Sequence, residues 1–238
     1  ITPAKRINIR PGLRFVHNSV YDAPPAIPSL NLKFGLTEKL DLRVAYARGF
    51  RSPSIRELYF DFRDGSHDIL GNTELQAEYS NSFTGSLTLT AIQKESLRLS
   101  TSLSGFYNDV SNMIGYVQSA ANDRITTYGN IYKFKTRGAT LSGNLVHNNF
   151  NASLGFSCTG RYNQYKPGDA SLASFKWSVE TNALVGYSFS KIGMNVNLFY
   201  KFTGRQPYYR MITANGADEV QLMQTSGYHW ADLTINKK

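Results

Sequence analysis

Apolar and polar side chains alternate along most of this chain. Alternation at every second residue is typical of a β-strand whose two faces meet different surroundings. It is clearest over residues 79–91, where a row of Ser and Thr hydroxyls opposes an apolar row. No stretch keeps the helical period of 3.6 residues over a useful length, so we expect almost no helix. The alternating segments are residues 7–15, 30–36, 40–48, 79–91, 97–107, 139–145, 154–162, 177–189, 192–202 and 231–235.

The connections between these segments alternate between short and long. The short ones are residues 36–40, 92–96, 146–151 and 189–192, and the long ones are residues 18–26, 51–77, 109–137, 163–174 and 204–227. Short periplasmic turns and long extracellular loops characterise transmembrane β-barrels, whose tilted strands need ~9–11 residues to cross the bilayer. We therefore predict an all-β fold: part of an antiparallel, up-and-down transmembrane β-barrel with about ten strands.

Composition agrees with a protein that faces two solvents. Aromatic residues make up 13% and charged residues 18%, against about 25% charged residues in soluble domains. There is no run of about 18 apolar residues that would predict a membrane-crossing helix. Cys158 is the single cysteine, so we expect no disulfide within the chain.

The formal net charge of +9 raises the question of nucleic-acid binding. Lys and Arg are, however, scattered over every segment, and no nucleic-acid-binding signature is present. We expect no nucleic-acid partner, because a basic barrel interior or a rim facing lipopolysaccharide accounts for the charge equally well. The sequence also lacks the spacing of a catalytic triad, a phosphate-binding loop or a metalloprotease helix. We therefore expect no enzymatic activity.

A series of motifs lies between residues 50 and 82, where the strand pattern is interrupted. The motifs are Phe50-Arg51-Ser52-Pro53, Glu57-Leu58-Tyr59, Gly71-Asn72-Thr73-Glu74-Leu75 and Glu78-Tyr79-Ser80-Asn81-Ser82. In order and approximate spacing, the series resembles TonB-dependent outer-membrane receptors, which carry a Phe-Arg-Ala-Pro box followed by an Asn-Pro-Asn/Asp-Leu box. Ser52 takes the place of the family's Ala, and Thr73 takes the place of its Pro.

The resemblance covers nearly the whole chain and implies the later part of a receptor barrel. We expect residues 1–238 to be a partial receptor β-barrel, without the plug domain and the final hairpin. The resemblance places the intact receptor in the outer membrane of a Gram-negative bacterium, surrounded by outer-membrane lipid. It implies capture of a small-molecule iron complex and coupling to the TonB energy-coupling complex through the plug domain. No intrinsic cofactor is implied, since haem or another ferric complex would be the transported ligand.

His67 is the sharpest candidate for a ligand-binding residue, because it lies between the two boxes. In haem receptors of this family a histidine at this place serves as an axial ligand of the haem iron, and neutral imidazole suits that role. The alternative is an ordinary polar residue of a long loop.

Aromatic side chains beside the boxes could stack on a porphyrin or on catecholate rings. The candidates are Phe50, Tyr59, Phe60 and Phe62, and in the loop at residues 204–227 Tyr208 and Tyr209. The alternatives are an ordinary surface loop for the last two and an interfacial aromatic girdle, which we expect for Tyr46, Tyr79, Tyr107, Tyr162 and Tyr200.

Cationic side chains of the same region are further candidates. Arg51, Arg56 and Arg63 could pair with carboxylates of a cargo or be solvated loop charges. Tyr128, Asn130 and Lys133 resemble another family motif, which we expect to begin a strand rather than to bind a ligand.

Two other functions share the same strand pattern. A TonB-dependent receptor for a siderophore or for cobalamin would differ only in the chemistry of its loops. A passive porin-like barrel would be expected to carry few aromatic residues in its long loops, and the aromatic cluster at residues 58–62 disfavours it.

Overall fold

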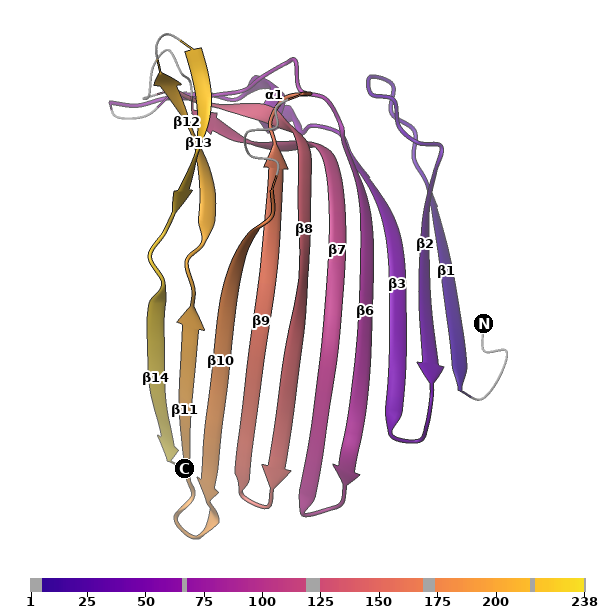
Figure 1. The fold of residues 1–238 in the computed structure, drawn as a ribbon, viewed down its shortest axis with the longest axis vertical. Helices are drawn as coiled ribbons and strands as arrows, with labels where there is room; N and C mark the ends of the chain where they lie inside the picture. The colour runs from indigo at the N-terminus through magenta and orange to yellow at the C-terminus, as the bar shows by residue number, and fades with distance from the viewer. Residues whose placement is uncertain (1–5, 66–67, 119–124, 169–173, 215–216, 238) are drawn as a thin grey trace.

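A single curved antiparallel sheet makes up most of the chain in the computed structural model (Figure 1). The structure describes residues 6–65, 68–118, 125–168, 174–214 and 217–237, with the side chains of residues 118 and 209–220 excepted. The long strands are β1 (Ile7–Phe15), β2 (Ala26–Gly35), β3 (Leu40–Arg51), β6 (Glu78–Gln93), β7 (Leu97–Gln118), β8 (Ile125–His147), β9 (Phe150–Gln164), β10 (Lys176–Phe189), β11 (Met194–Thr203) and β14 (Tyr228–Lys237).

The long strands follow one another across the sheet in chain order, and each pairs antiparallel with its predecessor. This confirms the prediction of an all-β, up-and-down antiparallel sheet with about ten long strands. The described residues contain only short helical pieces besides. The remaining elements are α1 (Ile55–Tyr59), β4 (Asp61–Arg63), β5 (Asp68–Leu70), η1 (Ser190–Ile192), β12 (Pro207–Ala214) and β13 (Ala217–Gln224).

The two ends of the sheet differ, as the sequence predicted. We call the end with residues 36–39, 94–96, 148–149 and 190–193 the turn end, and the opposite end the loop end. The turns are tight enough to need left-handed backbone at Asn148, with φ 49°, and at Gly193, with φ 62°. Figure 1 shows β12, β13 and α1 at the loop end.

The prediction of a long loop over residues 109–137 is wrong in extent. β6 stops pairing with β7 at Tyr79 and Ser111, yet β7 and β8 continue to pair with each other as far as Gln118 and Thr126. This ladder pairs the backbone polar groups with which the two strands face each other beyond the main sheet. The predicted loops at residues 51–77 and 204–227 likewise contain short elements that the sequence did not predict. The ninth segment begins later than predicted, because η1 occupies residues 190–192.

The strand register collects the alternating side chains into rows on two unlike faces. One row on the apolar face consists of Leu42, Leu87, Leu103, Leu141 and Phe156. The neighbouring row on the polar face consists of Arg43, Ser86, Ser104, Thr140 and Ser157. Each strand thus divides its side chains between an apolar and a polar environment, as barrel strands do.

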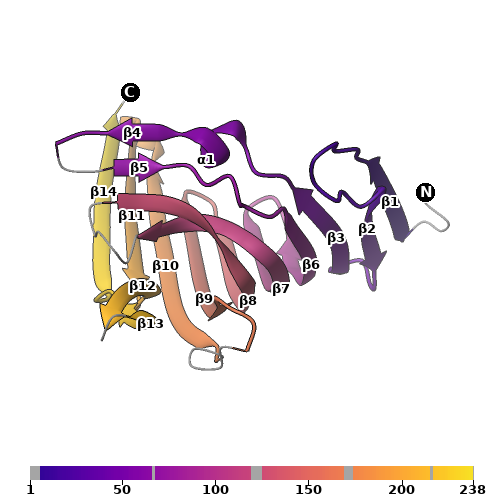
Figure 2. The ribbon, with the colours of Figure 1, turned by 90° about the horizontal axis from the view of Figure 1, so that it is seen from above.

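The polar face is the concave one. Seen from the loop end, the sheet forms an arc from β1 to β14, and α1, β4 and β5 lie within it (Figure 2). Glu57 of α1 contacts Arg51, which the alternation of β3 places on the polar face. Within the described residues, the buried hydrophobic cluster is small and lies at this end: Leu75, Ile114 and Tyr128, with Leu58 and Ile69 packed against it.

Candidate functional site

The candidate site begins with the short helix α1, which the sequence Ser54-Ile-Arg-Glu57 starts. The backbone N–H of Glu57 donates to Ser54 Oγ at 3.3 Å, and the backbone N–H of Ser54 donates to Glu57 Oε2 at 2.7 Å. This reciprocal pair is a capping box, which satisfies amide groups that have no partner within the helix. The helix ends at Tyr59, and Phe60 adopts an extended conformation that leads into β4.

Arg51 holds this helix against the sheet. Its guanidinium donates to Glu78 Oε1 at 2.7 Å and to Glu78 Oε2 at 3.0 Å. A further nitrogen donates to Glu57 Oε2 at 2.8 Å. The two carboxylates are largely buried, with side chains 16% and 17% exposed, whereas the Arg51 side chain is 43% exposed. A guanidinium fork shared by two carboxylates is both strong and geometrically specific.

The electrostatics of Glu57 follow from these contacts. Burial alone raises the pKa of the Glu57 carboxyl, but the hydrogen bonds from Arg51 and Ser54 outweigh burial and bring the pKa below its ordinary value of 4.5. Glu57 is therefore a stable anion that fixes both the helix start and Arg51.

Glu78 also connects Arg51 to the part of β7 that extends beyond its pairing with β6. Its Oε1 accepts the backbone N–H of Ile114 at 2.5 Å. Two residues earlier, Asn112 has φ 57°, a left-handed conformation that few residues except Asn, Asp and Gly adopt readily. This irregular residue therefore lies directly after the last pair between β6 and β7, at Ser111.

Asn72 and Asn130 join the second box to β8. Asn72 Nδ2 donates to the backbone oxygen of Tyr128 at 2.9 Å. Asn130 accepts the backbone N–H of Gln76 at 2.8 Å and donates to the backbone oxygens of Gln76 and Asn112 at 3.0 and 2.7 Å. The prediction placed Asn130 at the start of a strand and missed this anchoring role. Its partners lie 54 and 18 residues away along the chain.

The structure explains why the second motif, residues 71–75, begins with a glycine. A Cβ atom at this residue would come within 2.6 Å of backbone atoms of Leu58 and Tyr59. The Gly71 N–H donates to the Phe60 oxygen at 2.5 Å, and the Asn72 N–H donates to the Glu57 oxygen at 2.8 Å. The chain thus passes directly against the end of α1. We call the interlocked residues 51–57 and 71–78, with the strand residues that they contact, the platform.

The platform carries the hairpin of β4 and β5. Phe62 pairs with Ile69 across the hairpin, and β5 also pairs in parallel with the start of β8. The rings of Phe60 and Phe62 are stacked, with centroids 6.2 Å apart and planes at 10°. The Arg56 guanidinium lies 4.7 Å from the centroid of Phe60, and Tyr59 is 68% exposed. This region therefore presents an aromatic surface with an adjacent cation.

The predicted binding residues do not all meet at one place. Tyr59 and Phe60 lie together beside the hairpin, and His67 lies outside the described residues. Phe50 belongs to the apolar face, where its ring contacts Tyr79 with a centroid separation of 5.5 Å. Arg51 is neutralised by the two glutamates of the chain itself.

The second predicted loop forms a hairpin of its own. Tyr208 lies in β12, opposite Met223 of β13, and is 44% exposed. Tyr209 follows it in the same strand, and its side chain lies outside the described part. Seen from the loop end, the hairpin of β12 and β13 lies apart from β4 and β5, with the ends of β7 and β8 between them (Figure 2).

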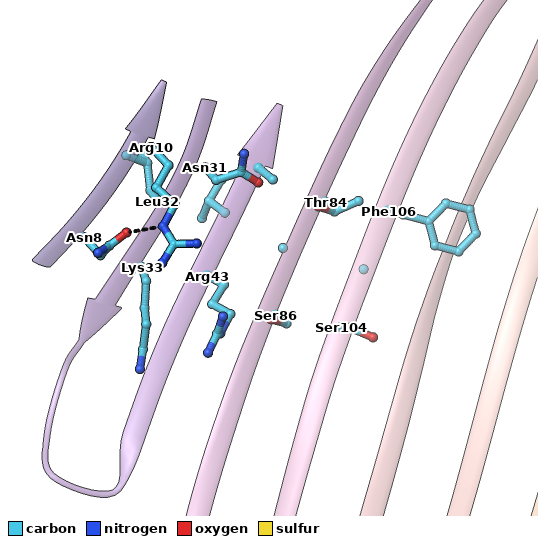
Figure 3. A pocket seen from close by; sticks show the side chains of 14 residues that line it. Asn8, Arg10, Asn31, Leu32, Lys33, Arg43, Thr84, Ser86, Ser104 and Phe106 are labelled. Carbon is cyan, nitrogen blue, oxygen red and sulfur yellow. Dashed lines mark hydrogen bonds between the residues drawn. The ribbon is translucent and has the colours of Figure 1, made fainter. Parts of the chain in front are cut away.

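A hollow on the concave face lies below the platform. It has a volume of about 880 Å³ and is lined by residues of β1, β2, β3, β6 and β7, most of them polar, with Leu32 and Phe106 among the apolar ones (Figure 3). Arg10 donates to Asn8 Oδ1 at 3.0 Å, and Lys33 pairs with Asp41 at 2.9 Å. The labelled lining side chains include Asn8, Arg10, Asn31, Lys33, Arg43, Thr84, Ser86 and Ser104.

The fold and the site together are those of a barrel-type β-sheet protein, with an apolar outer face, a polar inner face and structured loops at one end. Among the described residues, no helix has both the length and the apolar character needed to span a membrane. The family model described as "TonB dependent receptor-like, beta-barrel" matches residues 1–238. The chain therefore belongs to the TonB-dependent receptor β-barrel family, whose members are receptors of the Gram-negative outer membrane. In this family the loop end is extracellular.

Individual relatives match at lower similarity. The haemoglobin and haemoglobin-haptoglobin-binding protein B of Haemophilus influenzae is 33% identical over 90 residues, which are 38% of this chain and 8% of that protein. Among solved structures, a mutant of the ferric enterobactin receptor of Pseudomonas aeruginosa has a TM-score of 0.69 at 19% identity, covering 99% of this chain and 36% of that one. The siderophore receptor PirA of Acinetobacter baumannii has a TM-score of 0.67 at 16% identity, covering 99% and 38%. The chain thus spans only a minor part of these relatives.

Proposed function

We propose that this chain is part of an outer-membrane receptor that captures an iron complex, with haem as the cargo, for TonB-dependent import. The observation that carries the proposal is the aromatic surface of Tyr59, Phe60 and Phe62, held at the extracellular end by the platform. Tyr59 is 68% and Phe62 44% exposed. Flat, exposed aromatic rings suit a planar porphyrin, on which they can stack.

Two further observations favour haem over other iron complexes. The Arg56 guanidinium beside Phe60 can pair with a propionate carboxylate of haem. The Haemophilus relatives are named for the binding of haemoglobin. We assign His67 as the axial ligand of the haem iron, on the connection between Arg63 and Asp68, which pair across the hairpin.

The remaining candidates take supporting roles in this proposal. Tyr208 and Tyr209 supply a second contact surface on the hairpin of β12 and β13. Arg51 positions α1 instead of contacting the cargo, because its charge is already matched by Glu57 and Glu78. Phe50 joins the rim of the apolar face, where it meets Tyr79. Release of the cargo into the periplasm requires a plug domain and the TonB complex in the intact receptor.

A haemin titration of the full-length receptor, followed at the Soret band, tests the proposal. Wild type is compared with His67→Ala and with the matched control His147→Ala. His147 is exposed and is the last residue of β8, at the turn end of the sheet. We expect a shifted Soret band in wild type and in the control, and its loss or strong weakening in His67→Ala. An unchanged titration in His67→Ala would remove His67 from the site.

A ferric siderophore is the second candidate cargo, because the solved structures with the same fold include receptors named for enterobactin and for siderophores. If haemin produces no spectral change in any of the three proteins, the haem proposal fails. Quenching of Trp fluorescence by ferric catecholate complexes and by cobalamin then identifies the cargo class.

A further inference from the structure

The apolar face carries an aromatic row near its extracellular limit. The cross-strand register aligns Tyr46, Phe83, Tyr107, Arg137, Gly160 and Trp177 in one row from β3 to β10. Aromatic rows on barrel exteriors lie at the membrane interface. Two rows closer to the turn end, the same strands present Leu42, Leu87, Leu103, Leu141 and Phe156. The row therefore marks the level at which hydrocarbon gives way to lipid headgroups.

Arg137 interrupts this row and is fixed by its aromatic neighbours. Its guanidinium lies 4.0 Å from the ring centroid of Phe175 and 5.2 Å from that of Trp177. Gly160 stands between Arg137 and Trp177 in the register, and a Cβ atom there would come within 3.1 Å of both rings. The glycine thus leaves room for the two rings against which Arg137 stacks. A stacked guanidinium keeps its N–H groups available to an anion.

Two lysines continue from Arg137 toward the loop end on the same face of β8. Lys135 pairs in register with Asp109, and Lys135 Nζ lies 3.3 Å from the carboxylate. Lys133 Nζ donates to Ser111 Oγ at 2.8 Å. Two-residue steps along a strand are ~6.6 Å apart, so the cations rise in sequence from the aromatic row. We call Lys133, Lys135 and Arg137 the outer cation patch.

We propose that the outer cation patch binds the phosphate groups of a lipopolysaccharide molecule in the outer leaflet. The patch carries three positive charges against the one negative charge of Asp109, and it lies at headgroup level on the membrane-facing side of the sheet. The outer leaflet that surrounds such a receptor consists of lipopolysaccharide, whose lipid part bears phosphates. Arg137 and the lysines are suited to phosphate oxygens, while the acyl chains cover the apolar rows below. The site is independent of the proposed cargo, which binds on the concave side.

Binding of purified lipid A to the delipidated full-length receptor tests this site. The variant Lys133→Gln/Lys135→Gln/Arg137→Gln is compared with Arg10→Gln/Lys33→Gln/Arg43→Gln, which removes the same charge from the concave face. Each cation near a charged lipid surface adds to the attraction and three are removed, so we expect lipid A to bind the first variant at least about tenfold more weakly. The second variant should bind like wild type, and lipid A without its phosphates should bind all three weakly.

Arg137→Lys separates stacking from charge. It keeps the positive charge but loses the planar fork, so we expect binding between that of wild type and of the triple variant. This single change also provides the test if the triple variant fails to show the heat-dependent gel mobility of a folded barrel. Equal lipid A binding by wild type and by the outer variants would overturn the proposal. So would equal losses in both triple variants, or phosphatidylglycerol binding as tightly as lipid A. Haemin titration of the same proteins reports on the cargo site separately.

Discussion

Replacement of Arg51 by Gln should loosen the platform without unfolding the barrel. The substitution leaves two carboxylates, with side chains only 16% and 17% exposed, close together and without their shared cation. Breaking a fully buried ion pair costs about 3–5 kcal/mol. Since the Arg51 side chain is 43% exposed, solvent screening reduces this cost, and we expect a local loss of about 2 kcal/mol.

Hydrogen exchange of the full-length receptor, read by mass spectrometry, measures this loss. A change of 2 kcal/mol corresponds to about thirtyfold faster exchange, and it should be confined to residues 54–60 and 112–116. Arg63→Gln is the matched control, because Arg63 lies in the same connection and pairs with Asp61 at 2.9 Å, but both side chains are more than 60% exposed, at 63% and 62%. That control should leave the exchange unchanged. Unchanged exchange in Arg51→Gln, or equal acceleration in both variants, would show that the fork does not hold α1.

Three further predictions concern the same region. Asn130→Ala removes three hydrogen bonds to Gln76 and Asn112 and should raise exchange at residues 72–78 by the equivalent of about 2–3 kcal/mol, whereas Asn144→Ala, on the same strand, should not. Because the pKa of Glu57 is lowered in the folded protein, its contribution to the stability of the platform is complete above pH 4.5 and is lost as the pH falls through the folded pKa. Trypsin cleavage after Arg56, assayed on protein briefly exposed to each pH, should therefore increase only after exposure below pH 4.5. Tyr59→Ala should leave the melting temperature unchanged, because the ring is 68% exposed, and should weaken haemin binding about tenfold; unchanged affinity would exclude this ring from the site.

The long strands could be predicted because each one separates an apolar environment from a polar one. That requirement imposes a period of two, and residues 79–91 display it almost without exception. The period fails beyond Ser111 and before Lys133, where platform and loop residues cover the paired strands and alternation is no longer required. Here Ile114 and Tyr128 are buried in the same cluster. The extended hairpin was therefore missed.

The motifs themselves could be recognised, but their contacts could not. Ser54 and Glu57 have the spacing of a capping box, and this local signal would have predicted the start of α1. The pairing of Arg51 with Glu78 depends on how β3 and β6 align across a connection of 26 residues, residues 52–77. Asn72 reaches Tyr128 over 56 positions. Sequence pattern alone carries no information on contacts of that range.

The separation between platform and hairpin tip has a consequence for how such a receptor can change. Arg63 and Asp68 close the ladder of β4 and β5, and the ladder is tied to β8 through backbone bonds, which do not depend on side-chain identity. The hydrogen bonds described above for Arg51, Asn72 and Asn130 are made with other residues, so substitutions or insertions between Arg63 and Asp68 leave those hydrogen bonds in place. Selection for a new cargo, or for escape from a binding antibody, can therefore act on the tip while the membrane-spanning wall and its motifs stay constant. The anchoring residues of the family motifs, such as Arg51 and Asn72, are then less informative than the tip about what an individual receptor carries.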